Sequence, residues 1–149
     1  MKYTEARLGR VFILRFEDGD TVNDEIENFA REHSITAASV HIIGGADKDS
    51  RLITGPERGR QTPIVPIEQL LEEVHEAAGV GTIFPDESGE PVLHLHMACG
   101  RKSSTITGCT RSGVKVWQIM EAIIFELTEC PAVRAHDAET GFKLLKITN

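Results

Sequence analysis

Two histidines one residue apart, in the stretch Leu93-His94-Leu95-His96-Met97, are the side chains of this sequence best suited to bind a metal ion. Residues i and i+2 of an extended segment lie on the same face. Both imidazoles therefore point one way, while the leucines and the methionine point the other, towards a core. Because zinc usually takes three or four protein ligands, the pair needs a third ligand nearby.

The segment that follows predicts a second strand paired with the first. Residues 100–104 are a polar turn signal, and residues 105–111 again alternate between two kinds of side chain, which is typical of a β-hairpin. If Ile106 lies on the core face, Cys109 lies on the face of the histidines. A slip of one residue would move Cys109 to the opposite face.

In this register His96 would lie beside Cys109, and His94 would lie beside Arg111. Imidazole and thiolate ligands suit a soft or borderline ion, and zinc is the first choice among these. The sequence therefore predicts a metal site made of His94, His96 and Cys109, with an open fourth position. The alternative is a polar face washed by solvent, in which Cys109 is a small, half-buried residue.

Length and composition favour one domain over residues 1–149. The chain is 40% hydrophobic, which is enough for a substantial core. No apolar run is long enough for a membrane-spanning helix, and the N-terminus lacks the apolar stretch of a signal peptide. Three cysteines are an odd number without the spacing of a disulfide framework, so we expect a cytoplasmic protein with reduced thiols.

The charge of the chain weighs against direct DNA binding. The formal net charge is −7 at pH 7, so the protein as a whole does not attract phosphates. Arg58-Gly59-Arg60 resembles the core of an AT-hook, a motif that enters the DNA minor groove. Gln61 replaces the expected proline, however, and flanking basic residues are missing. We expect this segment to be a solvated loop.

The remaining pattern predicts an α+β fold that is mainly antiparallel sheet with one main helix. Thr21 and Asp24 resemble a capping box, and apolar residues repeat at helical spacing from there to residue 33. The segment 67–78 is ambiguous between helix and strand. Strands are predicted at 11–16, which reads as buried, and at 35–43, 79–84, 116–127, 133–136 and 142–147.

Glu121 lies inside the apolar segment 116–127 and is a candidate for acid–base chemistry. A carboxylate in apolar surroundings needs a partner or a wet cavity, and burial would raise its pKa towards a useful range. The alternative is a buried salt bridge, for example to Arg111 or Arg101. If Arg111 lies on the histidine face, it could hold a carboxylate or an oxyanion.

Together these residues resemble the PPC domain (plants and prokaryotes conserved domain), over roughly residues 10–147. The resemblance is carried by His94-x-His96-x-x-x-Gly100, Gly108-Cys109, the strand with Glu121, and Thr140-Gly141-Phe142. The PPC domain occurs alone in bacteria and archaea and is fused to AT-hooks in plant nuclear proteins. The resemblance implies an antiparallel sheet with few helices, assembled as a homotrimer. It also favours a strand for residues 67–78.

The resemblance further implies a zinc site in some prokaryotic members, built from the His-x-His pair and a third histidine. Here Gly108-Cys109-Thr110-Arg111 stands where a Gly-Gly-His stretch would be expected. The chain departs from the family at this point, unless Cys109 replaces the histidine as a ligand. The alternation of the hairpin favours that replacement independently.

Two classes of function are compatible with these observations. The first is a zinc-binding homotrimeric module with a regulatory, DNA-associated role that it exerts through protein partners. The second is a zinc-dependent enzyme acting on a small oxygenated substrate, because the same fold and ligands are similar to those of acetolactate decarboxylase. In that enzyme zinc polarises a substrate carbonyl. Here Glu121 would move protons and Arg111 would hold an anion. A deep cavity over the ion would favour the enzyme, and a flat site would favour the module.

Overall fold

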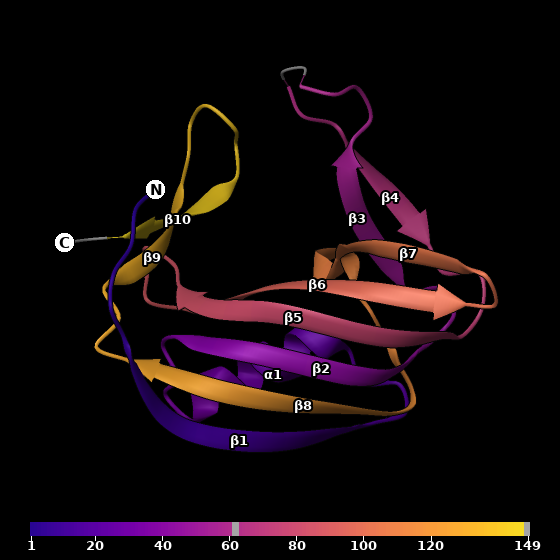
Figure 1. Ribbon diagram of the computed structural model, residues 1–149, viewed down its shortest axis with the longest axis horizontal. Coiled ribbons are helices and arrows are strands. Elements are labelled where there is room, and N and C mark those ends of the chain that lie inside the picture. Colours follow the sequence, from indigo (N-terminus) through magenta and orange to yellow (C-terminus); the bar gives the residue numbers. More distant parts are fainter. Residues whose placement is uncertain (61–62, 148–149) are drawn as a thin grey trace.

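A computed structural model of the chain describes residues 1–60 and 63–147, so Gln61, in the segment that resembles an AT-hook, lies outside the described residues. Its main feature is an antiparallel sheet of eight strands in the order β1-β8-β2-β5-β6-β7-β3-β4 (Figure 1). The strands are β1 (Arg7–Glu17), β2 (Ala38–Ala46), β3 (Arg51–Pro56), β4 (Pro66–Leu70), β5 (His75–Pro85), β6 (Pro91–Arg101), β7 (Ser104–Cys109) and β8 (Val116–Thr128). The single-domain, mainly antiparallel α+β fold is as predicted.

Four further elements complete the fold. Strands β9 (Ala132–His136) and β10 (Lys143–Ile147) form a separate antiparallel hairpin, as the sequence predicts. A short 3₁₀ helix, η1 (Thr110–Ser112), follows β7, and the helix α1 (Val22–Glu32) follows β1. Within the described residues, no helix has the length and apolar character that crossing a membrane requires.

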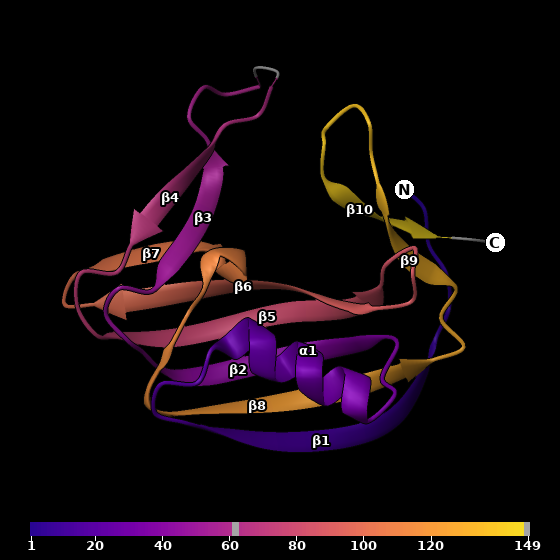
Figure 2. The ribbon, with the colours of Figure 1, turned by 180° about the vertical axis from the view of Figure 1, so that it is seen from behind.

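Helix α1 covers one face of the sheet (Figure 2). Its buried side chains Val22, Ile26 and Ala30 recur at helical spacing and pack into the main core. The helix begins where the sequence predicts, but the predicted capping box is wrong. The side chain of Thr21 makes no capping hydrogen bond, and its backbone instead forms an isolated antiparallel bridge with Lys115.

No helix of the described chain covers the opposite face of the sheet. Large apolar side chains lie exposed on it, and we call this surface the open face: Val11, Ile13, Ile43, Val80 and Ile123. Ile13 keeps 83% of its surface exposed. The prediction of a buried strand at 11–16 is therefore wrong for this side of β1, although Phe16 on the other side is buried.

The segment 67–78 is not one continuous strand. Strand β4 ends at Leu70 and β5 begins at His75, so four residues interrupt the predicted element. The interruption has a structural cause, because the fully buried Leu71 anchors the chain. Its backbone N–H donates to the carbonyl of Ser50, and its carbonyl accepts from Asp49. The chain can therefore turn from the β3–β4 hairpin into the central sheet.

Candidate metal centre

The hairpin formed by β6 and β7 has the predicted register. His96 pairs with Cys109, and Arg101 pairs with Ser104 across a two-residue turn, in which Lys102 has a φ of 53°. The buried faces of both strands belong to the core, with Cys99 opposite Ile106. Because directly opposed residues share a face, this register brings the thiol to the side of the imidazoles.

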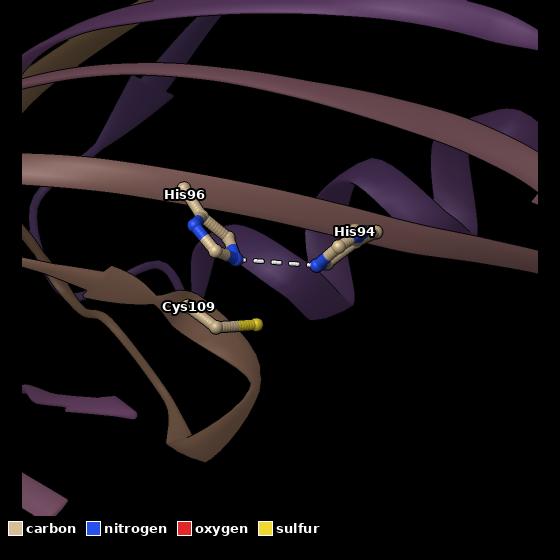
Figure 3. A group of neighbouring side chains, drawn as sticks. All are labelled: His94, His96 and Cys109. Atoms are coloured by element: carbon tan, nitrogen blue, oxygen red, sulfur yellow. Dashed lines mark hydrogen bonds between the residues drawn. The ribbon is translucent and has the colours of Figure 1, made fainter. Parts of the chain in front are cut away.

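Three candidate ligands converge on one side of this hairpin (Figure 3). One ligand atom from each of His94, His96 and Cys109 lies within 4.8 Å of the other two. The two Nε2 atoms are 3.2 Å apart. Ligands held by one tetrahedral zinc ion are separated by about 3.3–3.7 Å, so the cluster needs only small adjustments to share an ion.

Glycine at position 108 sets the distance between the site and the neighbouring strand. A Cβ atom on Gly108 would lie 2.6 Å from the carbonyl oxygen of Ile53, which is closer than real side chains come. Strand β3 therefore passes tightly against β7, where Ile53 pairs with Cys109. This contact fixes β3 as a wall beside the candidate site.

The surroundings of His94 favour its neutral form, the form that binds metals. Partial burial lowers the pKa of this histidine, and the positive charge of Arg134 and the nearby His96 and Arg111 lower it further. A neutral imidazole has a free lone pair for a metal ion. The histidines are open to solvent, whereas Cys109 keeps only 6% of its surface exposed.

A cavity of about 1180 Å³ lies over the cluster. The histidines and Cys109 lie among its lining residues, the β3–β4 hairpin supplies Ile53 and neighbouring residues, and the β9–β10 segment supplies Phe142 and others. Figure 1 shows both hairpins standing on the same side of the sheet. The site is therefore enclosed between two projecting hairpins and is not a flat surface.

Arg111 lines this cavity, but it does not pair with His94. Strand β7 ends at Cys109, and the chain turns into η1, where the N–H of Gly113 donates to the carbonyl of Thr110. Arg111 therefore lies near His94, as predicted, but not as its strand partner, because the strand stops two residues earlier than the alternation suggests. The guanidinium of Arg111 lies over the ring of Phe142, 5.5 Å from its centroid.

Glu121 is placed differently from the expectation. It is exposed, pairs with Arg15 and Ile43 on the open-face side of β8, and does not line the cavity. Neither the buried carboxylate nor the predicted salt bridge to an arginine is present at this position in the described residues. The prediction is wrong because β8 is apolar on both faces, of which α1 covers only one.

Arg134 is the residue of this site that sequence reasoning missed. It comes from β9, lines the cavity, and keeps only 6% of its surface exposed. Its Nη2 donates to the hydroxyl of Thr82 at 2.8 Å, and Thr82 is the β5 residue paired with His94. A charged residue inside the short apolar segment 132–135 was the available signal, but nothing local linked that segment to the histidines.

Comparisons with known proteins address the family and the fold. Residues 3–128 match the family model of the Plants and Prokaryotes Conserved (PCC) domain. No curated protein sequence gives a significant match.

Several solved structures share the fold. A metal-containing protein from Archaeoglobus fulgidus is 24% identical and superimposes with a TM-score of 0.84, over 98% of this chain and 99% of its own. A plant- and prokaryote-conserved (PPC) protein from Pyrococcus horikoshii is 20% identical, with a TM-score of 0.82 over 100% and 99% of the two chains. A protein from Bacteroides thetaiotaomicron described as a "putative DNA binding protein" is 16% identical, with a TM-score of 0.77 over 95% and 97%.

Proposed function

This chain belongs to the Plants and Prokaryotes Conserved domain family, and on that premise we propose that it is a zinc-binding homotrimeric module of the cytoplasm. Its role is regulatory and DNA-associated, and it is exerted through protein partners. The observation that carries the proposal is the convergence of His94, His96 and Cys109 on one point.

The chemistry of the three side chains supports zinc. Two imidazoles and one thiolate suit a borderline ion and do not suit magnesium or calcium, which prefer oxygen ligands. Three protein ligands leave a fourth position for water or a bound molecule. The Archaeoglobus fulgidus protein of the same fold is described as metal-containing.

The open face supports self-association. Exposed apolar patches of this kind usually mark a contact with another protein or membrane. The patch on the open face runs across four adjacent strands: β1, β8, β2 and β5. A trimer that buries this face would remove these side chains from water, in keeping with the assembly that the family resemblance implies.

Charge supports an indirect association with DNA. The chain is acidic overall, and Arg58 and Arg60 are exposed at the tip of the β3–β4 hairpin with no complete AT-hook around them. A partner with its own DNA-binding surface would supply the contacts to phosphates. All three cysteines are free thiols, which fits a reducing compartment.

The cavity favours a second candidate, a zinc-dependent enzyme acting on a small oxygenated substrate. A space of about 1180 Å³ over a three-ligand site is large enough to admit a small molecule to the open position. A zinc ion held there would act as a Lewis acid. Arg111 lines the cavity and keeps its proposed role as an anion-binding group.

Metal analysis of the purified protein tests the zinc site. We expect about one zinc per chain by mass spectrometry in protein prepared without chelators, and its loss in Cys109→Ala. Cys130→Ala is the matched control, because Cys130 is also free but does not belong to the cluster. Zinc far below one equivalent in the wild type, or full zinc content in Cys109→Ala, would contradict the proposal.

Light scattering coupled to size-exclusion chromatography tests the assembly. We expect a trimer for the wild type and monomers for Ile13→Lys and Val80→Lys, since each places a charge in the apolar open face. Leu145→Lys, an exposed leucine of β10 outside that face, should remain trimeric. A monomeric wild type would rule out the trimer.

A further inference from the structure

We propose that the cavity binds a small 2-hydroxycarboxylate with an apolar tail. Arg134 holds the carboxylate, and the neighbouring hydroxyl oxygen takes the open position on the metal ion. This inference rests on the metal site of the proposed function. It names the ligand of the site and the residue that selects it.

Arg134 is a buried cation without an anionic partner. Among residues 1–60 and 63–147, no carboxylate lies within ion-pair distance of its guanidinium. Its one side-chain hydrogen bond in this part of the structure goes to the neutral hydroxyl of Thr82, and its buried Nε has no acceptor. An unpaired charge in such a position is unfavourable, so a bound anion would stabilise it.

The position of Arg134 directs such an anion to the metal cluster. Its hydrogen-bond partner Thr82 and the ligand His94 are directly opposed on β5 and β6, on the same face of the sheet. Directly opposed side chains start about 4.5–5.5 Å apart at Cβ. A molecule with an anionic end at Arg134 therefore has its next polar atom near the cluster.

Charge balance makes an anion the natural complement. When Cys109 binds zinc it does so as a thiolate, and one thiolate cannot neutralise both a divalent ion and a guanidinium. The lining also contains the carboxylates of Asp24, Glu27 and Glu139. Glu27 is already engaged, since it accepts the N–H of Leu93 at 2.9 Å. This mixed lining suits a singly charged carboxylate better than a doubly charged phosphate.

The rest of the lining indicates a hydroxyl and an apolar tail. The buried Oδ1 of Asn23, on a residue that also lines the cavity, has no donor, and a hydroxyl group is able to supply one. Apolar side chains contribute the largest part of the remaining walls, among them Ile53, Ile64, Phe142 and Leu144. A cation, an orphaned acceptor and an apolar wall together match a branched 2-hydroxy acid.

Calorimetry on the zinc-loaded full-length protein tests the inference, after its zinc content has been measured. The probe is 2-hydroxy-4-methylpentanoate, and two comparison ligands each lack one feature: 4-methylpentanoate lacks the hydroxyl, and the amide of the probe lacks the charge. We expect both to bind at least about tenfold more weakly than the probe. In cobalt-substituted protein, the probe should also change the visible spectrum of the metal.

The matching variant is Arg134→Gln, which should retain zinc and weaken the probe at least about tenfold. Arg101→Gln is the control, because Arg101 donates to the carbonyl of Val74 and does not line the cavity. No binding to zinc-loaded wild type, or equal binding by Arg134→Gln, would overturn the inference and leave the metal site intact.

Failure of the metal site would appear earlier, as missing zinc before any ligand is added. If Arg134→Gln does not fold, the comparison of the probe with its amide on the wild type still decides whether the cavity requires a negative charge. Equal affinity for the two would then overturn the inference.

Discussion

Two regions of the molecule bury an ionisable side chain. In one region the chain itself supplies an oppositely charged partner, and in the other it does not. At the β1–β8 edge, the Glu126 carboxylate accepts the backbone N–H of Arg10 at 3.0 Å and two guanidinium nitrogens at 2.7 and 2.6 Å. In the cavity, Arg134 has no anionic partner among the described residues: its guanidinium donates to the neutral hydroxyl of Thr82 and lies 5.7 Å from the centroid of the Phe84 ring. The first group is satisfied within the chain and the second is not.

The pair of Arg10 and Glu126 at the β1–β8 edge depends on an irregularity in the backbone of β1. The register of β1 against β8 shifts between Leu8 and Val11, and a Cβ atom on Gly9 would lie 2.7 Å from Oε2 of Glu126. Glycine at this irregularity leaves room for the carboxylate to reach the backbone N–H of Arg10. Such a pair has a structural role, because nothing from outside the chain is needed to complete it.

This contrast separates buried charges with a structural role from those with a functional one. Breaking a satisfied pair leaves an uncompensated group, so the folded state is destabilised. Removing a charge that has no partner relieves a cost instead, so its retention needs another explanation, such as a ligand. The stability of variants at Glu126 and Arg134 should therefore change in different directions.

Glu126→Ala should give the largest change in stability. The substitution leaves the backbone N–H and the guanidinium of Arg10 without their acceptor, and we expect a loss of about 2 kcal/mol in the free energy of unfolding. Urea denaturation measures it. Glu121→Ala, an exposed carboxylate on the same strand, should change stability by less than about 0.5 kcal/mol. Equal effects of the two variants would remove the distinction between the regions.

Acid should weaken the edge region first, with a smaller effect than truncation. The hydrogen bonds from Arg10 lower the pKa of Glu126 from 4.5 to about 2. Between these two pH values the carboxylate of Glu126 binds a proton more readily in the unfolded chain than in the folded one. The contribution of Glu126 to the free energy of unfolding is therefore complete above pH 4.5 and is lost as the pH falls towards 2. Unfolding measured across this window should depend less steeply on pH in Glu126→Gln.

A part of the acid sensitivity should remain in Glu126→Gln. Hydrogen bonds from Ser88 and Lys143 lower the pKa of Asp86, and hydrogen bonds from Thr140 lower that of Asp137. Asp86 and Asp137 therefore also stabilise the folded state less as the pH falls. An unchanged pH dependence in Glu126→Gln would show that the edge pair does not contribute to acid stability.

Arg134→Met should have the smallest effect on stability, and its sign is the informative result. Methionine keeps much of the volume and removes the unpaired charge, so we expect the metal-free protein to be unchanged or stabilised by up to about 1 kcal/mol. Thermal and urea unfolding of metal-free protein measure the change. A loss of 2 kcal/mol or more would show that Arg134 is a structural residue like Arg10.

The local geometry of the candidate metal site could be predicted from the sequence alone. Alternation puts His94 and His96 on one face, and the polar turn before residue 105 fixes the register that brings Cys109 beside His96. These inferences succeeded because hairpin neighbours are close in sequence and one face of each strand must be apolar. The prediction of the helix at 22–32 was correct for the same reason, since the spacing of its apolar residues is a local feature of the sequence.

The surroundings of this site follow from tertiary packing, which the sequence did not reveal. Strands β1 and β8 carry apolar side chains on both faces, so period-two alternation could not show that α1 covers one face and leaves Ile13 and Glu121 exposed on the other. Arg134 reaches the site from a hairpin distant in sequence, through its contact with Thr82. Contacts between distant segments depend on how whole elements pack, and no local spacing encodes that packing.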